Sequence, residues 1–236
     1  MKNIFLIFFI FLSIINTQEK HMKAPRGYLN NTFIKWSAML GWLDLVNTKP
    51  EIPDNIEVFS DLEFKKTEHR TLLLDIYRKK SINSSTPLIV FIHGGSWTKG
   101  NKKDYLIYLL SYAEKGYITA SLSYRFAQEA KFPAAVEDII CGVKWLKNNA
   151  FEYGIDTNNV ALVGGSAGAH LALMAAYSVG SSFGEENCES GFASQKVNAV
   201  VNFYGPADLT TDYAINQKET HFFLGIDYKS DPKKYL

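Results

Sequence analysis

The chain has little cysteine and almost no net charge. Two cysteines among 236 residues are too few for a disulfide scaffold or a multi-cysteine metal site. Lys plus Arg is 25 and Asp plus Glu is 24, so no excess of positive charge is available to neutralise phosphates. This balance argues against nucleic acid and anionic membrane surfaces as partners. The chain is 47% hydrophobic, which is enough apolar side chain to bury a sizeable core.

The two cysteines themselves leave two states open. Cys141 lies in a helical pattern and Cys188 in a loop-like stretch. An oxidising compartment would permit a disulfide between them. The sequence gives no distance between the two residues, and two free thiols are the interpretation that it favours.

The chain also lacks an apolar run long enough to cross a membrane. Ile4 to Ile15 is apolar over twelve residues apart from Ser13, whereas a spanning helix needs roughly 20. Such a run directly after a short basic start is typical of a secretory signal peptide. We therefore predict a signal peptide at 1–17, no stable membrane span, and a secreted or periplasmic protein. An uncleaved membrane anchor is the alternative, because no small-residue cleavage pattern follows the run.

The body of the chain alternates strand and helix patterns. Extended patterns predict an opening hairpin at 56–64 and 71–79, then strands at 88–92, 117–123, 160–163 and 197–203. Helical patterns lie between these strands, at 105–115, from Pro133 onward, and at 167–179. This order predicts an α/β fold with a mostly parallel sheet and helices on both faces, in a domain spanning 56–236.

A shorter helical segment is predicted before the hairpin, within 18–55. Apolar residues recur there at helical spacing, at Phe33, Trp36, Met39, Leu40, Leu43 and Val46. Such a stripe usually marks the face of a helix that packs on a core. A cap over a substrate pocket is the functional alternative.

The first chemical motif is Gly164-Gly165-Ser166-Ala167-Gly168, directly after the strand 160–163 and at the start of a helix. A sharp strand-to-helix turn of this kind exposes a serine hydroxyl, and its small neighbours tolerate the crowding. The positive end of the helix favours the negative charge that develops when an ester is attacked. A phosphate-binding turn is the alternative, but the further glycine or the Gly-Lys ending that such turns need is absent.

The second motif is His93-Gly94-Gly95-Ser96-Trp97, at the end of the strand 88–92. Adjacent glycines let backbone N–H groups point freely at a ligand. An acyl-transfer enzyme needs such donors for its oxyanion, from this loop and from the residue after the nucleophile. The candidate donors are Gly94, Gly95 and Ala167, with Ser166 as the nucleophile.

At these residues the chain resembles the α/β-hydrolase superfamily, and within it the HGG-type carboxylesterases. The resemblance runs from about Leu72 to the last residue and includes Ser123-Tyr124-Arg125 and Tyr153-Gly154-Ile155-Asp156. It implies a serine carboxylic-ester hydrolase that forms an acyl-enzyme, without cofactor or metal. The implied substrates are small-molecule or carbohydrate-linked esters, as in the hormone-sensitive-lipase-like, acetyl and feruloyl esterases. The oligomeric state is left open.

The chain departs from the family pattern after Ser166. The family places an acid and then a histidine on loops after its last two strands. Only 70 residues follow Ser166, so we expect those two strands, the acid and the histidine to be missing from this chain. Asp208 and His221 are substitutes in the right order, whereas His170 is expected to be a buried, hydrogen-bonded histidine.

Two alternatives to an active esterase follow from this departure. One is a catalytically impaired hydrolase-like protein that binds an ester or a partner. The other is a gene fragment that lacks the triad acid and histidine. Without a base, serine is a weak nucleophile near neutral pH, and the oxyanion donors alone leave roughly 10³–10⁴ of rate over water.

Overall fold

The computed structural model describes residues 31–40, 50–82, 85–179, 188 and 194–235. The chain divides into two compact units, Met1–Asn47 and Thr48–Leu236. In the first unit the described residues form helix α2 (Asn31–Met39). The second unit contains a six-stranded sheet in the order β1-β2-β4-β3-β5-β6. The predicted signal peptide at 1–17 lies outside the described residues.

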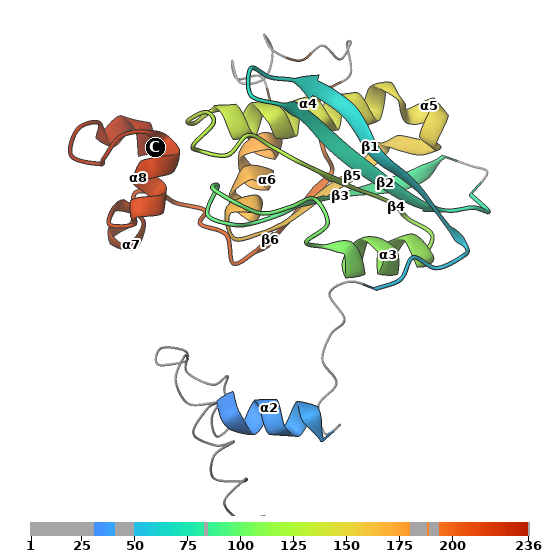
Figure 1. Ribbon diagram of the computed structural model, residues 1–236. Helices are drawn as coiled ribbons and strands as arrows, with labels where there is room; N and C mark the ends of the chain where they lie inside the picture. The colour runs from blue at the N-terminus through green and yellow to red at the C-terminus, as the bar shows by residue number, and fades with distance from the viewer. Residues whose placement is uncertain (1–30, 41–49, 83–84, 180–187, 189–193, 236) are drawn as a thin grey trace, which may run out of the picture. The chain divides into compact units, whose positions relative to one another are not determined.

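The sheet contains the predicted hairpin and the predicted parallel strands (Figure 1). Its strands are β1 (Ile56–Lys66), β2 (Thr71–Lys79), β3 (Thr86–Ile92), β4 (Ile118–Leu122), β5 (Ile155–Gly165) and β6 (Ala199–Phe203). β1 pairs with β2 and β2 with β4 in antiparallel fashion. β4, β3, β5 and β6 are parallel to one another. The parallel strands therefore bring their carboxyl ends, and both glycine motifs, to one edge of the sheet.

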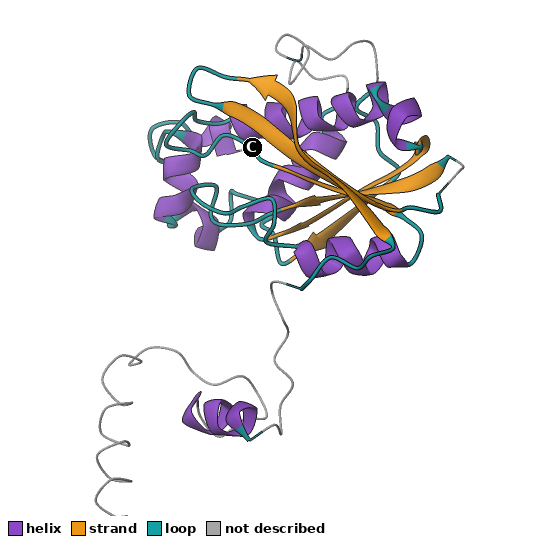
Figure 2. Ribbon diagram, turned by 45° about the vertical axis from the view of Figure 1, so that its right-hand side comes forward, coloured by secondary structure: helices purple, strands orange, loops and turns teal. Residues whose placement is uncertain are grey.

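Helices cover the two faces of this sheet (Figures 1 and 2). The helices of the second unit are α3 (Leu106–Glu114), α4 (Ala134–Asn148), α5 (Ala150–Tyr153), α6 (Ala167–Tyr177), α7 (Asp212–Ile215), α8 (Lys218–Leu224) and the 3₁₀ helix Pro232–Tyr235. α3 packs on one face, where Leu109 and Leu110 meet Phe91 of β3. α4 and α6 pack on the other face and enclose the larger core, which includes Val136 and Leu171. The prediction of an α/β sheet covered on both sides is confirmed.

Most predicted elements match the observed ones to within two residues at each end, and two call for comment. β5 begins at Ile155, because Ile155 and Asp156 pair with Thr86 and Pro87 before the apolar run starts. The residues that follow Ile155 are polar, so an apolar strand pattern does not extend into this part of β5. Helix α2 covers only the first part of the predicted N-terminal stripe, and the residues from 41 to 49 lie outside the described ones. A cap role for this segment stays a prediction.

β6 forms the end of the described sheet, where it pairs with β5 alone. Its side chains Val201 and Phe203 are exposed. Within the described part of the chain, no helix is both long and apolar enough to cross a membrane.

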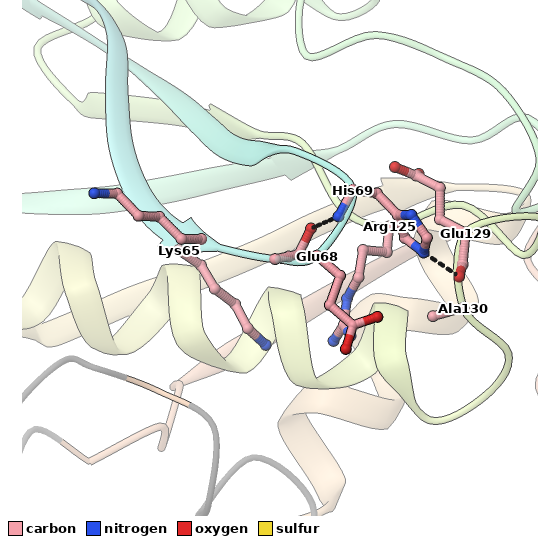
Figure 3. Close-up of a pocket in the computed structure, with 8 residues that line it drawn as sticks. Lys65, Glu68, His69, Arg125, Glu129 and Ala130 are labelled. Carbon is pink, nitrogen blue, oxygen red and sulfur yellow. Dashed lines mark hydrogen bonds between the residues drawn. The ribbon is translucent and has the colours of Figure 1, made fainter.

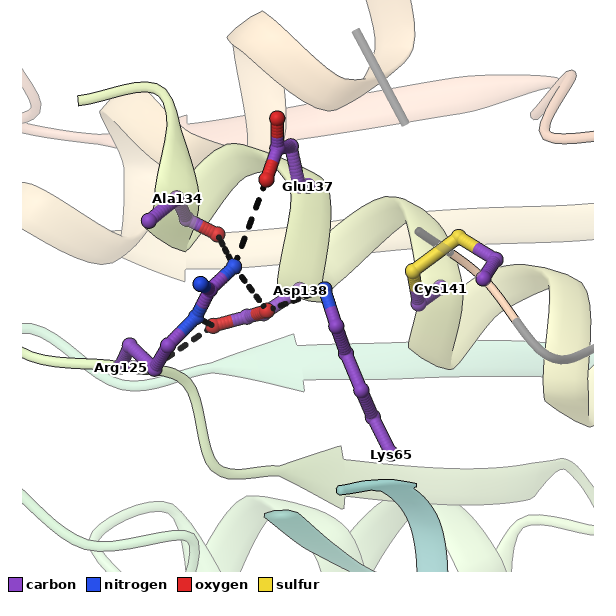
Figure 4. The surroundings of a disulfide bond; sticks show 7 residues. Lys65, Arg125, Ala134, Glu137, Asp138 and Cys141 are labelled. Atoms are coloured by element: carbon purple, nitrogen blue, oxygen red, sulfur yellow. Dashed lines mark hydrogen bonds and ion pairs between the residues drawn. A yellow bond between two sulfur atoms is a disulfide. The ribbon is translucent and has the colours of Figure 1, made fainter. Parts of the chain in front are cut away.

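The expectation of two free thiols is wrong, because Cys141 and Cys188 form a disulfide. Cys141 lies fully buried on α4, and the bond ties that helix to the segment between α6 and β6 (Figure 4). The cysteines are 47 residues apart, so the bond closes a long loop in the unfolded chain. The distance between two cysteines that are far apart in the chain depends on the tertiary structure, and a single sequence does not show it.

Removing this disulfide is expected to lower the free energy of unfolding by about 2–4 kcal/mol, because the unfolded chain regains the freedom of the loop. Denaturant unfolding of the protein with and without reductant measures the loss. A Cys141→Ala/Cys188→Ala double variant is the control, and reductant should leave its transition unchanged. Equal midpoints for the oxidised and reduced wild-type protein would contradict the prediction.

Candidate active site

Ser166 occupies the sharp turn between β5 and α6. Its backbone has φ 53° and ψ −126°, a conformation that L-residues rarely adopt. The turn fits only because its neighbours are small: a Cβ on Gly168 would lie 2.1 Å from the carbonyl oxygen of Ile92. We call residues 164–168 the serine turn. Its strain and crowding are those expected of a nucleophile held at the end of a sheet strand.

Backbone hydrogen bonds fix the serine turn on both sides. The Ser166 N–H donates to the carbonyl oxygen of Phe203 at 2.9 Å, which ties the turn to β6. The Ser166 carbonyl accepts the N–H of Ala169 at 3.0 Å and so begins helix α6. Ala167 is the first residue of that helix, where N–H groups have no partner within the helix. Its N–H is therefore available to an anion beside Ser166.

The HGG loop, which we define as residues 93–99, lies directly against the serine turn. A Cβ on Gly94 would be 2.7 Å from the Gly165 carbonyl oxygen and 3.4 Å from the Ser166 Cβ. Gly95 has φ 114°, and its carbonyl accepts the N–H groups of Thr98 and Lys99. The two motifs, 71 residues apart in sequence, thus meet at one point. This contact brings the backbone of Gly94 next to Ser166.

The side chain of His93 is buried and bonds to the HGG loop itself. Its Nδ1 donates to the carbonyl oxygen of Gly94 at 2.8 Å, and its ring stacks on Tyr124 with 4.4 Å between centroids. The hydroxyl of Tyr124 donates to the His93 carbonyl at 3.0 Å. Burial lowers the pKa of His93, so the imidazole stays neutral and keeps this single donated proton.

A tyrosine pair at the serine turn was missed by sequence reasoning. The hydroxyls of Tyr105 and Tyr204 lie 2.3 and 2.9 Å from the position that a Cβ on Gly165 would take. Burial, helped by a hydrogen bond to Tyr204, raises the pKa of Tyr105 to about 12. Tyr204 has φ 49°, another strained backbone at a strand end. Tyrosine is too common for its spacing alone to have pointed to this pair.

The two substitute triad residues lie in different surroundings. The Asp208 carboxylate accepts from the Thr210 N–H at 2.7 Å and from the Thr210 hydroxyl at 2.6 Å, which lowers its pKa. His221 Nε2 donates to the Ile215 carbonyl at 2.6 Å. Asp208 borders a cavity with His170, whereas His221 borders another with Lys131. A triad of Ser166, Asp208 and His221 stays a prediction.

The hydroxyl of Ser166 has no hydrogen-bond partner among the described residues. A general base would have to lie within about 2.6–3.2 Å of that oxygen, or reach it through one water. The described contacts place Ser166 beside the HGG loop and at the start of α6, and they assign no base to its hydroxyl. Among the described residues, no cluster of His, Cys, Asp or Glu could hold a metal ion.

His170 is buried, as predicted, but the expected hydrogen bond is not formed at one of its nitrogens. It lies on α6 one turn after Ser166, is 5% exposed, and its Nδ1 has no partner in the described structure. Its ring contacts Trp97 and Phe223 edge to face. Burial lowers its pKa to about 4, because the charged imidazolium would lose its hydration.

His170 is expected to make the protein less stable as the pH falls. Its pKa is lower in the folded state than the usual 6.5, so the unfolded chain binds more protons between about pH 6.5 and 4. The free energy of unfolding should therefore fall across this window, by about 3 kcal/mol for a shift of this size. Urea unfolding at several pH values tests this, with His170→Phe as the comparison. An equally steep decline in that variant would contradict the assignment.

A further cavity, of about 390 Å³, opens beside the β1–β2 turn (Figure 3). Three of its charged side chains are paired: Glu129 contacts Arg70 at 2.7 Å, and Lys65 and Arg125 each contact Asp138 at 2.8 Å. His69 Nε2 donates to the Glu129 carbonyl, a bond drawn in Figure 3. β1 lies at the opposite end of the sheet from β5 and β6. This cavity is therefore separate from the Ser166 site.

The sheet order, the strained serine at the end of β5 and the glycine loop against it define the fold class as an α/β hydrolase. The chain belongs to the BD-FAE family, which it matches over residues 74–236. It is similar to the probable carboxylic ester hydrolase LipM of Mycobacterium tuberculosis, with 34% identity over 153 residues. It is also similar to esterase LipQ of the same organism, with 33% identity over 172 residues.

These matches cover 63% and 69% of this chain, but only 34% of LipM and 40% of LipQ. The chain thus spans well under half the length of these curated relatives. Among solved structures, the esterase Est2 of Thermogutta terrifontis superposes with a TM-score of 0.61 and 25% identity. That match covers 77% of this chain and 65% of Est2. The resemblance to α/β-hydrolase carboxylesterases is confirmed, whereas loss of a C-terminal part stays a prediction.

Proposed function

We propose that this chain carries the nucleophile and oxyanion site of a serine carboxylic-ester hydrolase. Ser166 is the nucleophile, and the N–H groups of Gly94, Gly95 and Ala167 are the oxyanion donors. The observation that carries the proposal is the contact between the two motifs. A Cβ added at Gly94 would lie only 3.4 Å from the Cβ of Ser166. A substrate carbonyl bound over Ser166 can therefore direct its oxygen toward three backbone donors at once.

The chemistry follows the acyl-enzyme scheme. The Ser166 oxygen attacks the ester carbonyl carbon and passes its proton to a solvent water, and the carbonyl oxygen becomes an oxyanion held by the N–H groups. The oxyanion then collapses, the bond to the alcohol oxygen breaks, and the alcohol leaves with a proton. Water repeats the attack on the acylated serine and releases the acid. The positive end of α6 and the fixed N–H groups stabilise the charge in both steps.

The substrates in this proposal are small-molecule or carbohydrate-linked esters, the range that the family resemblance implies. Export from the cytoplasm belongs to the same proposal. The apolar run from Ile4 to Ile15 supports export, and so does the Cys141–Cys188 disulfide, since such bonds persist mainly in oxidising compartments.

One observation favours a second candidate, a hydrolase-like binding protein with little turnover. The described contacts assign no base to Ser166, and serine without a base reacts slowly near neutral pH. Such a protein would bind an ester or an ester analogue without being acylated at a useful rate.

A fluorophosphonate probe separates the two candidates. The proposed hydrolase should be labelled in equal molar amount, and peptide mapping should locate the phosphonate on Ser166. Binding of a short-chain ester with no covalent label would favour the binding protein. A label on any residue other than Ser166 would refute the site assignment.

A further inference from the structure

The HGG loop holds three consecutive residues in the left-handed region. Gly95 has φ 114°, Ser96 has φ 52° and Trp97 has φ 58°. Glycine adopts such angles freely, but a bulky residue such as tryptophan does so at a cost. A strained conformation persists only when surrounding contacts over-determine it. The positions of the Gly94 and Gly95 N–H groups therefore depend on the contacts that hold Trp97 in this conformation.

Trp97 is anchored by its own side chain in the core. It is 5% exposed, although it stands in a loop. Its ring stacks on Phe223 of α8, with 4.6 Å between centroids and 16° between planes. His170 meets the same two rings edge to face, at 5.4 Å from Trp97 and 5.5 Å from Phe223. The indole Nε1 has no hydrogen-bond partner among the described residues, so ring packing is what holds the side chain.

Phe223 is itself fixed in place. It is 1% exposed, and its carbonyl accepts the N–H of Phe132 at 2.9 Å. The ring of Phe132 also meets it edge to face, at 5.8 Å. Its neighbour Phe222 differs, because that side chain is 43% exposed and lies under the ammonium of Lys131. Helix α8 thus presents one aromatic ring to the HGG loop and one to the surface.

We propose that Phe223, acting through Trp97, is a positioning residue for the oxyanion donors of the HGG loop. The catalytic effect of this positioning rests on the proposed function, whereas the positioning of the loop itself does not. Neither side chain is assigned a contact with the substrate. Loss of the stacked ring would let the HGG loop relax from its strained conformation and move the Gly94 and Gly95 N–H groups away from the Ser166 oxyanion.

The kinetic test compares Phe223→Leu with Phe222→Leu, two adjacent substitutions of the same kind. Phe223→Leu should lower kcat for a short-chain 4-nitrophenyl ester roughly 10- to 100-fold with little change in KM, since small displacements of catalytic groups act on the transition state. Phosphonylation of Ser166 should slow by a similar factor. Phe222→Leu should stay within about twofold of wild type, the scale of an exposed substitution. Phe223→Tyr keeps the stacked ring and should recover most of the loss.

Hydrogen exchange of the HGG loop gives a readout that needs no catalysis. Amides of residues 94–99 should exchange faster in Phe223→Leu than in wild type, and at wild-type rates in Phe222→Leu. Unchanged exchange in a folded Phe223→Leu variant would overturn the inference, as would equal kinetic losses in both variants. If the wild-type chain neither hydrolyses ester nor accepts the phosphonate, the proposed function fails, and the exchange data alone decide whether Phe223 positions the loop.

Discussion

Replacing Ser166 with alanine is expected to abolish covalent labelling and to lower ester hydrolysis to the small residual rate that the oxyanion donors support without a nucleophile. The alanine cannot form the acyl-enzyme, while the N–H groups of the HGG loop and of α6 remain in place. Removal of the nucleophile in a serine hydrolase with a complete triad costs about 10⁶ in kcat. A short-chain 4-nitrophenyl ester and a fluorophosphonate measure the two effects on the same preparations.

Ser60→Ala is the matched control for this prediction. Ser60 is an exposed serine on β1, at the far end of the sheet from β5. Its replacement should change neither labelling nor hydrolysis. Because Ser166 has left-handed backbone angles, the alanine variant must also be shown to keep the wild-type circular dichroism and denaturation midpoint. A folded Ser166→Ala variant that still hydrolyses the ester at the wild-type rate would refute the nucleophile assignment.

Replacing Asp138 with alanine is expected to lower the free energy of unfolding by about 3–5 kcal/mol. Asp138 is fully buried on α4 and binds two cations from other elements (Figure 4). Its Oδ1 contacts Lys65 Nζ at 2.8 Å and Arg125 Nη2 at 2.8 Å, and its Oδ2 accepts from Arg125 Nε at 2.8 Å. The Lys65 side chain is only 6% exposed, so the substitution would leave a buried ammonium without its carboxylate.

Glu137→Ala provides a control on the same helix. Glu137 contacts Arg125 at 3.3 Å but leaves the Lys65–Asp138 pair intact, and its loss should cost about 1 kcal/mol or less. A Lys65→Met/Asp138→Leu double variant removes the buried ammonium together with the carboxylate and should recover part of the stability, since Arg125 keeps its contact with Glu137. Urea unfolding measures all three variants. Equal midpoints for Asp138→Ala and Glu137→Ala would contradict the role given to this ion network.

The fold was predictable from the sequence because its strands and helices leave local patterns, and the meeting of the two glycine motifs follows from the order of the strands. The apolar run of β3 and the small residues at the end of β5 can each be recognised from a few consecutive residues. The rule that parallel strands share a carboxyl edge then brings the HGG loop to the serine turn. β3 and β5 are neighbouring parallel strands, so the residues that follow them, Gly94 and Ser166, lie close together.

The features that escaped prediction depend on three-dimensional proximity. Tyr105 directly precedes α3 and Tyr204 directly follows β6, and nothing in their local patterns links them to Gly165. The disulfide joins a helix to a polar stretch, and no local pattern indicates how close these two segments lie. The stacking of Trp97 on Phe223 joins segments more than a hundred residues apart in the numbering. Side chains brought together by tertiary packing leave no periodic signal.

Trapping of the acyl-enzyme tests the central proposal most directly. The full chain is incubated with 4-nitrophenyl acetate, quenched in acid and analysed by intact mass and peptide mapping, beside Ser166→Ala. The proposed site predicts one acetyl group on the peptide that contains Ser166, and none on the alanine variant. Ester turnover with no acetyl on Ser166, or an acetyl group at another residue that persists in Ser166→Ala, would contradict it.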